Sequence, residues 1–401
     1  MERTANIGLA SWREQKAALS GNRALSIRMF ATILVACGFL SAVLASWLPL
    51  QVSVVTVFLF AGPHNWFELR YFLMRLPLRF GKSRNFFIAA FGGIAFLTLT
   101  YVSLPALYSF GVVPNHLWPT ILATWNTMLL LWIGLLVWLR GKNKVRRDWS
   151  WAFALTLALC SLNWLAPEFF SLGIVYLHPL VALCFLDRHL ARTRPQWLRA
   201  YRGCLCLLPL LLLGMFWQLS QSPALADDNG LFWRITQHAG AQLLPNISSH
   251  MLVASHVFLE MLHYGVWLVA LPLISPISRS SKTEDKLPRP ISSGSGRVVY
   301  PRPLNGNQCE RGQAALPNPE TLYLESESRR RDCIWNVRTV PLARHPSGFP
   351  KLVATALAVG VFLIAVLWFG FSVDYTTTRD VYFTLAIAHV IAEAPFLLRM
   401  I

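Results

Sequence analysis

The sequence predicts an all-α integral membrane protein with about ten membrane-spanning helices. Of its 401 residues, 55% belong to the apolar set and only 14% are charged, whereas soluble domains have roughly 25% charged residues. The apolar residues are gathered in runs of about 20, the length that an α-helix needs to cross a bilayer. This composition excludes an ordinary soluble domain and a disordered chain.

Ten such runs alternate with polar segments or with proline and glycine. They cover residues 27–48, 52–73, 85–107, 119–139, 149–165, 168–186, 204–219, 249–272, 352–373 and 380–400. The chain therefore divides into an N-terminal tail (1–26), a bundle of eight spans (27–275), a loop (276–351) and two final spans (352–401). Residues 221–246 mix apolar and polar side chains, a pattern typical of an interfacial or re-entrant helix.

The net charge of +17 reflects topology. When the loops are assigned alternately to the two sides, all of the 36 Lys and Arg residues except Arg234 and Arg379 fall on one side. Basic residues concentrate in cytoplasmic loops, so both termini are expected in the cytoplasm, with the chain in an inner or plasma membrane. A basic surface of this kind favours membrane lipids as partners and argues against nucleic acid.

The loop 276–351 differs in composition from the rest of the chain. It is rich in proline, glycine and serine and contains the run Arg329-Arg330-Arg331. Its apolar content is too low to offset the entropy lost on ordering. We expect a flexible, basic cytoplasmic loop and no independent domain.

Carboxylates inside the spans give the strongest indication of function, because a buried charge in a membrane is costly and is usually functional. Three glutamates lie well inside spans, and each has a histidine four residues before it, on the same helix face. The three pairs are His64 and Glu68, His256 and Glu260, and His389 and Glu393. His263 adds a further imidazole to the span that holds Glu260. Counted along the helices, His64, Glu260, His263 and His389 fall near mid-membrane.

Mixed imidazole and carboxylate ligands are typical of zinc and non-haem iron. The sequence predicts metal ligands at His64, His256, Glu260, His263 and His389. We assign Glu68 and Glu393 catalytic roles as proton-handling or ligand-orienting groups. Iron is favoured over zinc, and haem is an alternative cofactor. Glu260-x-x-His263 has the spacing found in di-iron helical bundles but occurs only once. The sequence therefore does not decide between one metal ion and two.

Other polar residues near the spans have simpler interpretations. His178 precedes Pro179 and is interpreted as a hydrogen-bonding packing residue. Asn126 and Asn163 lie in or near spans and are further candidates for the site. Pro63, directly before His64, is expected to kink its span and make room there.

In kind, this pattern is similar to integral-membrane metalloenzymes with histidines on several spans, such as fatty-acid desaturases and hydroxylases, carotenoid-cleaving oxygenases and zinc lipid amidases. The His-x-x-His-His boxes of the desaturases are absent from this sequence, so no residue roles are carried over. The favoured function is an oxidative membrane metalloenzyme acting on a lipid or isoprenoid-like substrate. The alternatives are a zinc-dependent lipid hydrolase, a metal-free proton-relay transporter, a haem-binding redox protein, and purely structural His–Glu ion pairs.

Overall fold

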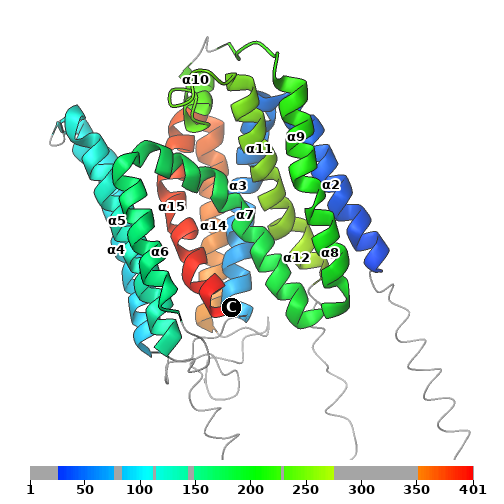
Figure 1. The fold of residues 1–401 in the computed structure, drawn as a ribbon, viewed down its shortest axis with the longest axis horizontal. Helices are drawn as coiled ribbons and strands as arrows, with labels where there is room; N and C mark the ends of the chain where they lie inside the picture. The colour runs from blue at the N-terminus through cyan, green and yellow to red at the C-terminus, as the bar shows by residue number, and fades with distance from the viewer. Residues whose placement is uncertain are drawn as a thin grey trace, which may run out of the picture.

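A computed structural model describes residues 26–75, 84–111, 114–142, 149–226, 230–274 and 351–400. These residues form a bundle of long helices, with no β-strand among them (Figure 1). The predicted N-terminal tail and basic loop lie outside the described residues, except for Ser26 and Lys351. The predicted all-α membrane fold is confirmed.

Every predicted span is helical. The long helices are α2 (Ile27–Trp47), α3 (Pro49–Arg75), α4 (Arg84–Ser109), α5 (Trp118–Lys142), α6 (Trp151–Leu165), α7 (Pro167–Thr193), α11 (Ser249–Gly265), α14 (Lys351–Val373) and α15 (Tyr375–Met400). The shorter elements are η1 (Asn115–Leu117), η2 (Pro195–Trp197), α8 (Leu198–Leu205), α9 (Leu207–Leu219), α10 (Gly230–His238), the π-helical turn η3 (Val266–Ala270) and α12 (Leu271–Ile274). The segment from η2 to α9 is long and apolar enough to form one span, and so is the segment from α11 to α12.

Eight of the described helical segments are long and apolar enough to cross a membrane, fewer than the ten that the sequence predicts. The two others are α3 and α6. Helix α6 has only 15 residues, which span about 22 Å, less than the hydrocarbon core of about 30 Å. Helix α3 has 27 residues, but polar side chains such as His64, Asn65 and Glu68 lower its hydropathy. Two of these polar residues, His64 and Glu68, are also candidate metal ligands.

Helix α11 occupies the centre of the bundle and packs against α2, α3 and α7 (Figure 1). In the most apolar part of its span, 67% of the residues are buried, compared with 11% for α14 at the periphery. Helices α4, α5 and α6 form one side of the bundle, and α15 connects them to the centre by packing against α4, α5 and α7. Polar side chains on α3, α7, α11 and α15 are thus held away from the lipid.

Helices α4 and α5 pack closely through Gly93. A Cβ atom placed there would lie 1.8 Å from Nε1 of Trp132, and this indole donates a hydrogen bond to the Ala89 carbonyl at 2.8 Å. We expect Gly93→Ala to destabilise the protein by about 1–3 kcal/mol, the usual cost of overpacking. Thermal unfolding in detergent measures this loss of stability. A Cβ atom at the neighbouring Gly92 would meet no other side chain or helix within 4 Å, so Gly92→Ala is the control, and equal melting temperatures for the two variants would contradict the packing.

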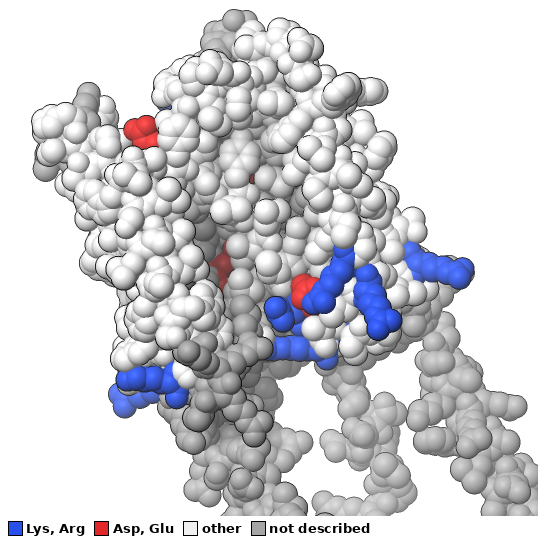
Figure 2. Space-filling model, in the orientation of Figure 1, with Lys and Arg blue, Asp and Glu red and all other residues white. Residues whose placement is uncertain are grey.

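Basic side chains gather at one end of the bundle in the view of Figure 2. The sequence places two basic residues on the other side. Arg234 of α10 forms an ion pair with Asp380, and Arg379 is buried, with only 4% of its surface exposed. The helix α10 itself lies in the segment expected to hold an interfacial helix.

The cytoplasmic location of both termini stays a prediction. Reporter tags at the N-terminus, near residue 300 and at the C-terminus are all expected to be cytoplasmic, because the loops on that side carry nearly all the Lys and Arg. Protease protection or cysteine labelling in intact cells measures their location. A tag near residue 300 on the opposite side would contradict the number of crossings.

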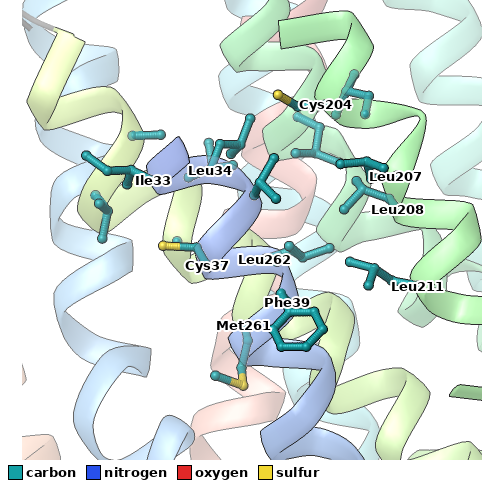
Figure 3. A pocket seen from close by; sticks show the side chains of 18 of the residues that line it. Ile33, Leu34, Cys37, Phe39, Cys204, Leu207, Leu208, Leu211, Met261 and Leu262 are labelled. Atoms are coloured by element: carbon teal, nitrogen blue, oxygen red, sulfur yellow. The ribbon is translucent and has the colours of Figure 1, made fainter. Parts of the chain in front are cut away.

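An apolar crevice of about 300 Å³ opens between α2, α9 and the α11–α12 segment (Figure 3). Its walls are aliphatic and aromatic side chains, such as Leu34, Phe39 and Leu262, together with Cys37 and Cys204. No carboxylate or imidazole lines it among the described residues. Its described lining therefore contains no ligand of the type that a hard metal ion prefers.

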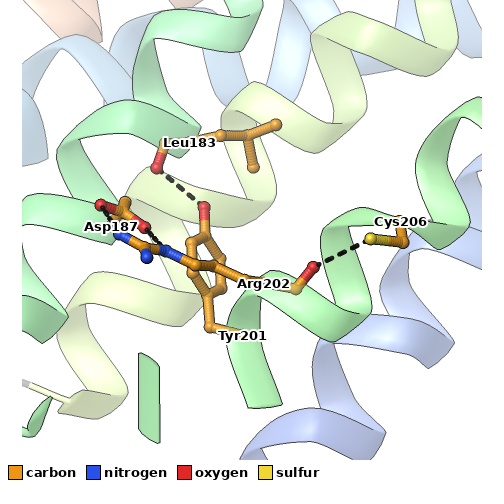
Figure 4. A network of polar contacts seen from close by, with 5 residues as sticks. All are labelled: Leu183, Asp187, Tyr201, Arg202 and Cys206. Carbon is orange, nitrogen blue, oxygen red and sulfur yellow. Dashed lines mark hydrogen bonds and ion pairs between the residues drawn. The ribbon is translucent and has the colours of Figure 1, made fainter. Parts of the chain in front are cut away.

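Polar contacts fix the turn between α7 and α8 (Figure 4). The Arg202 guanidinium donates to both carboxylate oxygens of Asp187, at 2.9 and 3.3 Å, and the Tyr201 hydroxyl donates to the Leu183 carbonyl at 2.7 Å. Such a bidentate pair constrains geometry more than a single contact does. These contacts hold the C-terminal part of α7, the helix that carries His178, against its neighbour.

Candidate metal centre

Four central helices contribute imidazole and carboxylate groups to one region inside the bundle. Helix α3 carries His64 and Glu68, α7 carries His178, α11 carries His263, and α15 carries His389 and Glu393. Helices α3, α7 and α15 each contain an internal proline within two residues of one of these side chains, namely Pro63, Pro179 and Pro395. We call these six residues the His/Glu cluster.

Four members of the His/Glu cluster offer ligand atoms that lie close to one another. His64, Glu68, His263 and His389 each offer one ligand atom, and these atoms all lie within 4.8 Å of one another. The ring centroid of His64 is 5.2 Å from that of His263 and 5.4 Å from that of His389. Ligand atoms on one zinc or iron ion lie roughly 3–4 Å apart. Only a small contraction would bring this set around an ion.

Hydrogen bonds to backbone carbonyls orient two of these imidazoles. Nδ1 of His64 lies 2.9 Å from the Phe60 carbonyl oxygen, and Nδ1 of His263 lies 3.4 Å from that of Pro179. A carbonyl only accepts, so each Nδ1 must carry the proton and each Nε2 then has a free lone pair. This is the arrangement that orients metal-binding histidines in known sites.

A second set lies beside the first. His178, His263 and Glu393 also have ligand atoms within 4.8 Å of one another. Nδ1 of His178 is 3.0 Å from Oε2 of Glu393, and its Nε2 is 3.3 Å from Nε2 of His389. His178, interpreted from the sequence as a hydrogen-bonding packing residue, thus lies among the candidate ligands.

The cluster contains buried polar atoms without hydrogen-bond partners. Glu68, His263 and Glu393 are each 2% exposed, yet both carboxylate oxygens of each glutamate and Nε2 of His263 make no hydrogen bond. The contact of His178 with Glu393 is close enough for an ion pair but lacks hydrogen-bond geometry. No ion pair with Lys or Arg is found for either glutamate within the described part of the chain. Burying such groups without partners is costly, and a cation bound between them would remove that cost.

His256 and Glu260 are not brought into the cluster, although the sequence predicts both as ligands. They form a second group with His238 of α10: Nδ1 of His256 lies 3.7 Å from Oε2 of Glu260, and the rings of His238 and His256 are 5.0 Å apart. The Arg379 charge is near enough to act on Glu260. We call His238, His256 and Glu260 the outer polar group.

One cavity of about 230 Å³ connects the His/Glu cluster with the outer polar group. His64, His178, His263 and His389 lie along it together with all three members of the outer polar group. The remaining wall is mostly aliphatic or aromatic, with Ile174, Val175, Ile387 and Val390 among the aliphatic residues, Tyr101, Tyr264 and Tyr382 among the aromatic ones, and Thr384 as a further hydroxyl residue. A ligand in this cavity would contact imidazoles along a wall that is otherwise largely apolar.

Asn126 and Asn163 do not line this cavity. The side chain of Asn126 donates to Asn163 at 2.9 Å, and Asn163 donates to the Ala123 carbonyl at 2.8 Å. These bonds join α5 to α6 at the side of the bundle. The two asparagines hold helices together, and the suggestion that they complete the site is not supported.

No protein-family model, curated protein or solved structure gives a significant match to this chain.

Proposed function

We propose that this chain is a membrane metalloenzyme that acts on a hydrophobic substrate at a metal centre held by the His/Glu cluster. One observation carries the proposal: four imidazoles and two carboxylates from four helices meet inside an apolar bundle, with several polar atoms left without hydrogen-bond partners. Membrane-spanning segments rarely keep ionisable groups that have no function.

The same observation argues against purely structural ion pairs. Such pairs would hold the spans together without a metal. Among the described residues His178 of α7 pairs with Glu393 of α15, and His256 pairs with Glu260 on α11. Both oxygens of the buried Glu68, however, remain without a hydrogen-bond partner beside His64, which ion pairs alone do not account for. A metal-free proton relay is also less favoured, because His64 and His263 are already oriented as metal ligands are.

The ligand types favour a first-row ion such as iron or zinc. No cysteine belongs to either candidate ligand group in the described residues, so a thiolate site is not indicated. A haem fits poorly, because its ring would have to lie between two axial histidines. The four imidazole centroids of the cluster are only 4.8–6.4 Å from their neighbours, and the remaining two rings would occupy the space of the porphyrin.

The cavity favours a lipid or isoprenoid-like substrate. Its aliphatic and aromatic wall suits an apolar chain, and the outer polar group offers hydrogen-bond donors and acceptors for a polar end of the substrate. With iron, the favoured reaction is oxidation of the substrate with dioxygen as the oxidant. With zinc, the metal would supply an activated water for hydrolysis.

Metal analysis combined with an optical spectrum of the purified protein tests this proposal. We expect stoichiometric iron and no Soret band. Stoichiometric zinc would instead support the lipid hydrolase, and a Soret band would support a haem protein. Protein purified from metal-replete cells without any bound metal, and unable to take up ferrous iron or zinc, would contradict the proposal and leave the proton-relay transporter.

A further inference from the structure

We propose that the His/Glu cluster holds two metal ions, with Glu68 bound to one and Glu393 to the other. This inference deepens the proposed function and rests on it. Three of its ligands lie outside the ligand set that the sequence predicts: His178, interpreted there as a packing residue, and the two glutamates, assigned there as catalytic groups.

The ligand atoms form two overlapping sets around two points. The first set is His64, Glu68, His263 and His389, and the second is His178, His263 and Glu393. In each set the atoms lie within 4.8 Å of one another, but His178 and Glu393 do not join the first set at that distance. A single ion could therefore bind all six side chains only after a larger rearrangement. Two ions would use the groups where they lie.

His263 stands at the junction of the two sets. Its ring centroid is 5.2 Å from that of His64 in the first set and 4.8 Å from that of His178 in the second. Its Nε2 is buried and unpartnered. Because Nδ1 carries the proton, Nε2 can bind only one ion, so His263 completes one set and leaves three ligands for each ion. Two metal ions in dinuclear enzymes lie about 3.5–4 Å apart.

The charges also fit two cations. Glu68 and Glu393 are each 2% exposed, so two ionised carboxylates would repel each other in this apolar interior unless cations lay beside them. All four of their oxygens lack hydrogen-bond partners. Carboxylates contributed by facing helices are the groups that hold pairs of iron or manganese ions in helical bundles. The cluster thus supplies four imidazoles and two carboxylates, enough for two ions with positions left open for substrate.

Anaerobic titration of the metal-free protein with ferrous iron, followed by removal of unbound iron, tests the inference. We expect two ions per wild-type chain and one in His178→Ala, which removes a ligand from the second set only. Glu393→Gln keeps the size of the side chain and serves as a second variant if His178→Ala does not fold; it should also bind one ion. His250→Ala is the matched control, because His250 bonds to the Ser46 carbonyl outside the cluster, and should bind two.

The outcomes separate this inference from the proposed function. One ion in the wild type and one in His178→Ala would overturn the two-ion site and leave the metalloenzyme standing. Two ions in the wild type and none in either folded variant would contradict the separate ligand sets. No iron in any form would overturn both proposals. In the oxidised wild type, magnetic coupling between the two ions should abolish the ordinary electron paramagnetic resonance signal of ferric iron, and His178→Ala should restore it.

Discussion

Replacing His263 by Ala should raise the Kd for the metal at least tenfold, equivalent to about 1.4 kcal/mol or more of binding free energy, and so lower the metal content of the purified protein. His263 belongs to both candidate ligand groups and its Nε2 has no protein partner. Its loss therefore affects the whole centre, and activity should fall with the metal. Elemental analysis after size-exclusion chromatography measures the effect.

The control for this variant lies on the same helix. His250 of α11 bonds to the Ser46 carbonyl at 2.9 Å, so His250→Ala removes a structural hydrogen bond, worth about 1 kcal/mol, but no proposed ligand. It should keep its metal. If His263→Ala retained the metal content of the wild type, or if both variants lost metal equally, His263 would not be a ligand.

Blocking the cavity should abolish the binding of hydrophobic ligands while sparing the metal. Ala386 of α15 lines the cavity near His389, and a phenyl ring there would fill much of the 230 Å³. We expect Ala386→Phe to weaken binding of a fluorescent polyene fatty acid, parinaric acid, at least tenfold, because overlap with the new ring cannot be relieved in a packed interior. Equilibrium titration of probe fluorescence in detergent gives the Kd.

The neighbouring Leu385 provides the matched control. Its side chain is 53% exposed on the same helix, so Leu385→Phe adds the same ring outside the cavity and should leave the Kd unchanged. Metal content should be normal in both variants. Equal Kd values for Ala386→Phe, Leu385→Phe and the wild type would show that the cavity does not take up the hydrophobic chain.

The helices could be predicted from the sequence because membrane-spanning segments are recognised by their length and apolar composition. The number of crossings was harder to predict. Helix α6 is short, and α3 carries the polar groups of the cluster, so neither satisfies a criterion based on length and hydropathy. Polar residues at the centre of a bundle lower the mean hydropathy of the helix that carries them, so that this helix resembles one that does not cross the membrane.

Much of the His/Glu cluster could be predicted because an i, i+4 spacing places two side chains on one helix face. This spacing indicated His64 with Glu68 and His389 with Glu393. It could not find His178, since the residue four positions later is Ala182. The position of His178 near the middle of α7 was the feature of the sequence that could have indicated its place in the cluster.

The same spacing led to an over-assignment on α11. His256 and His263 are seven residues apart, so they share a helix face but are separated by about 10 Å along the axis. One metal ion cannot bind both at about 2.0–2.1 Å. The structure accordingly places His263 in the cluster and His256 in the outer polar group, beside His238. That neighbour comes from α10 and could not be located from the sequence.

X-ray absorption spectroscopy of the metal-loaded protein tests the central claim most directly, because it reports on the ligand atoms themselves. We expect nitrogen and oxygen ligands at about 2.0–2.2 Å, with the outer-shell scattering of several imidazole rings that weakens in His263→Ala. Sulfur ligands at about 2.3 Å, or a first shell without imidazole scattering, would contradict a metal centre built from His64, His263 and His389.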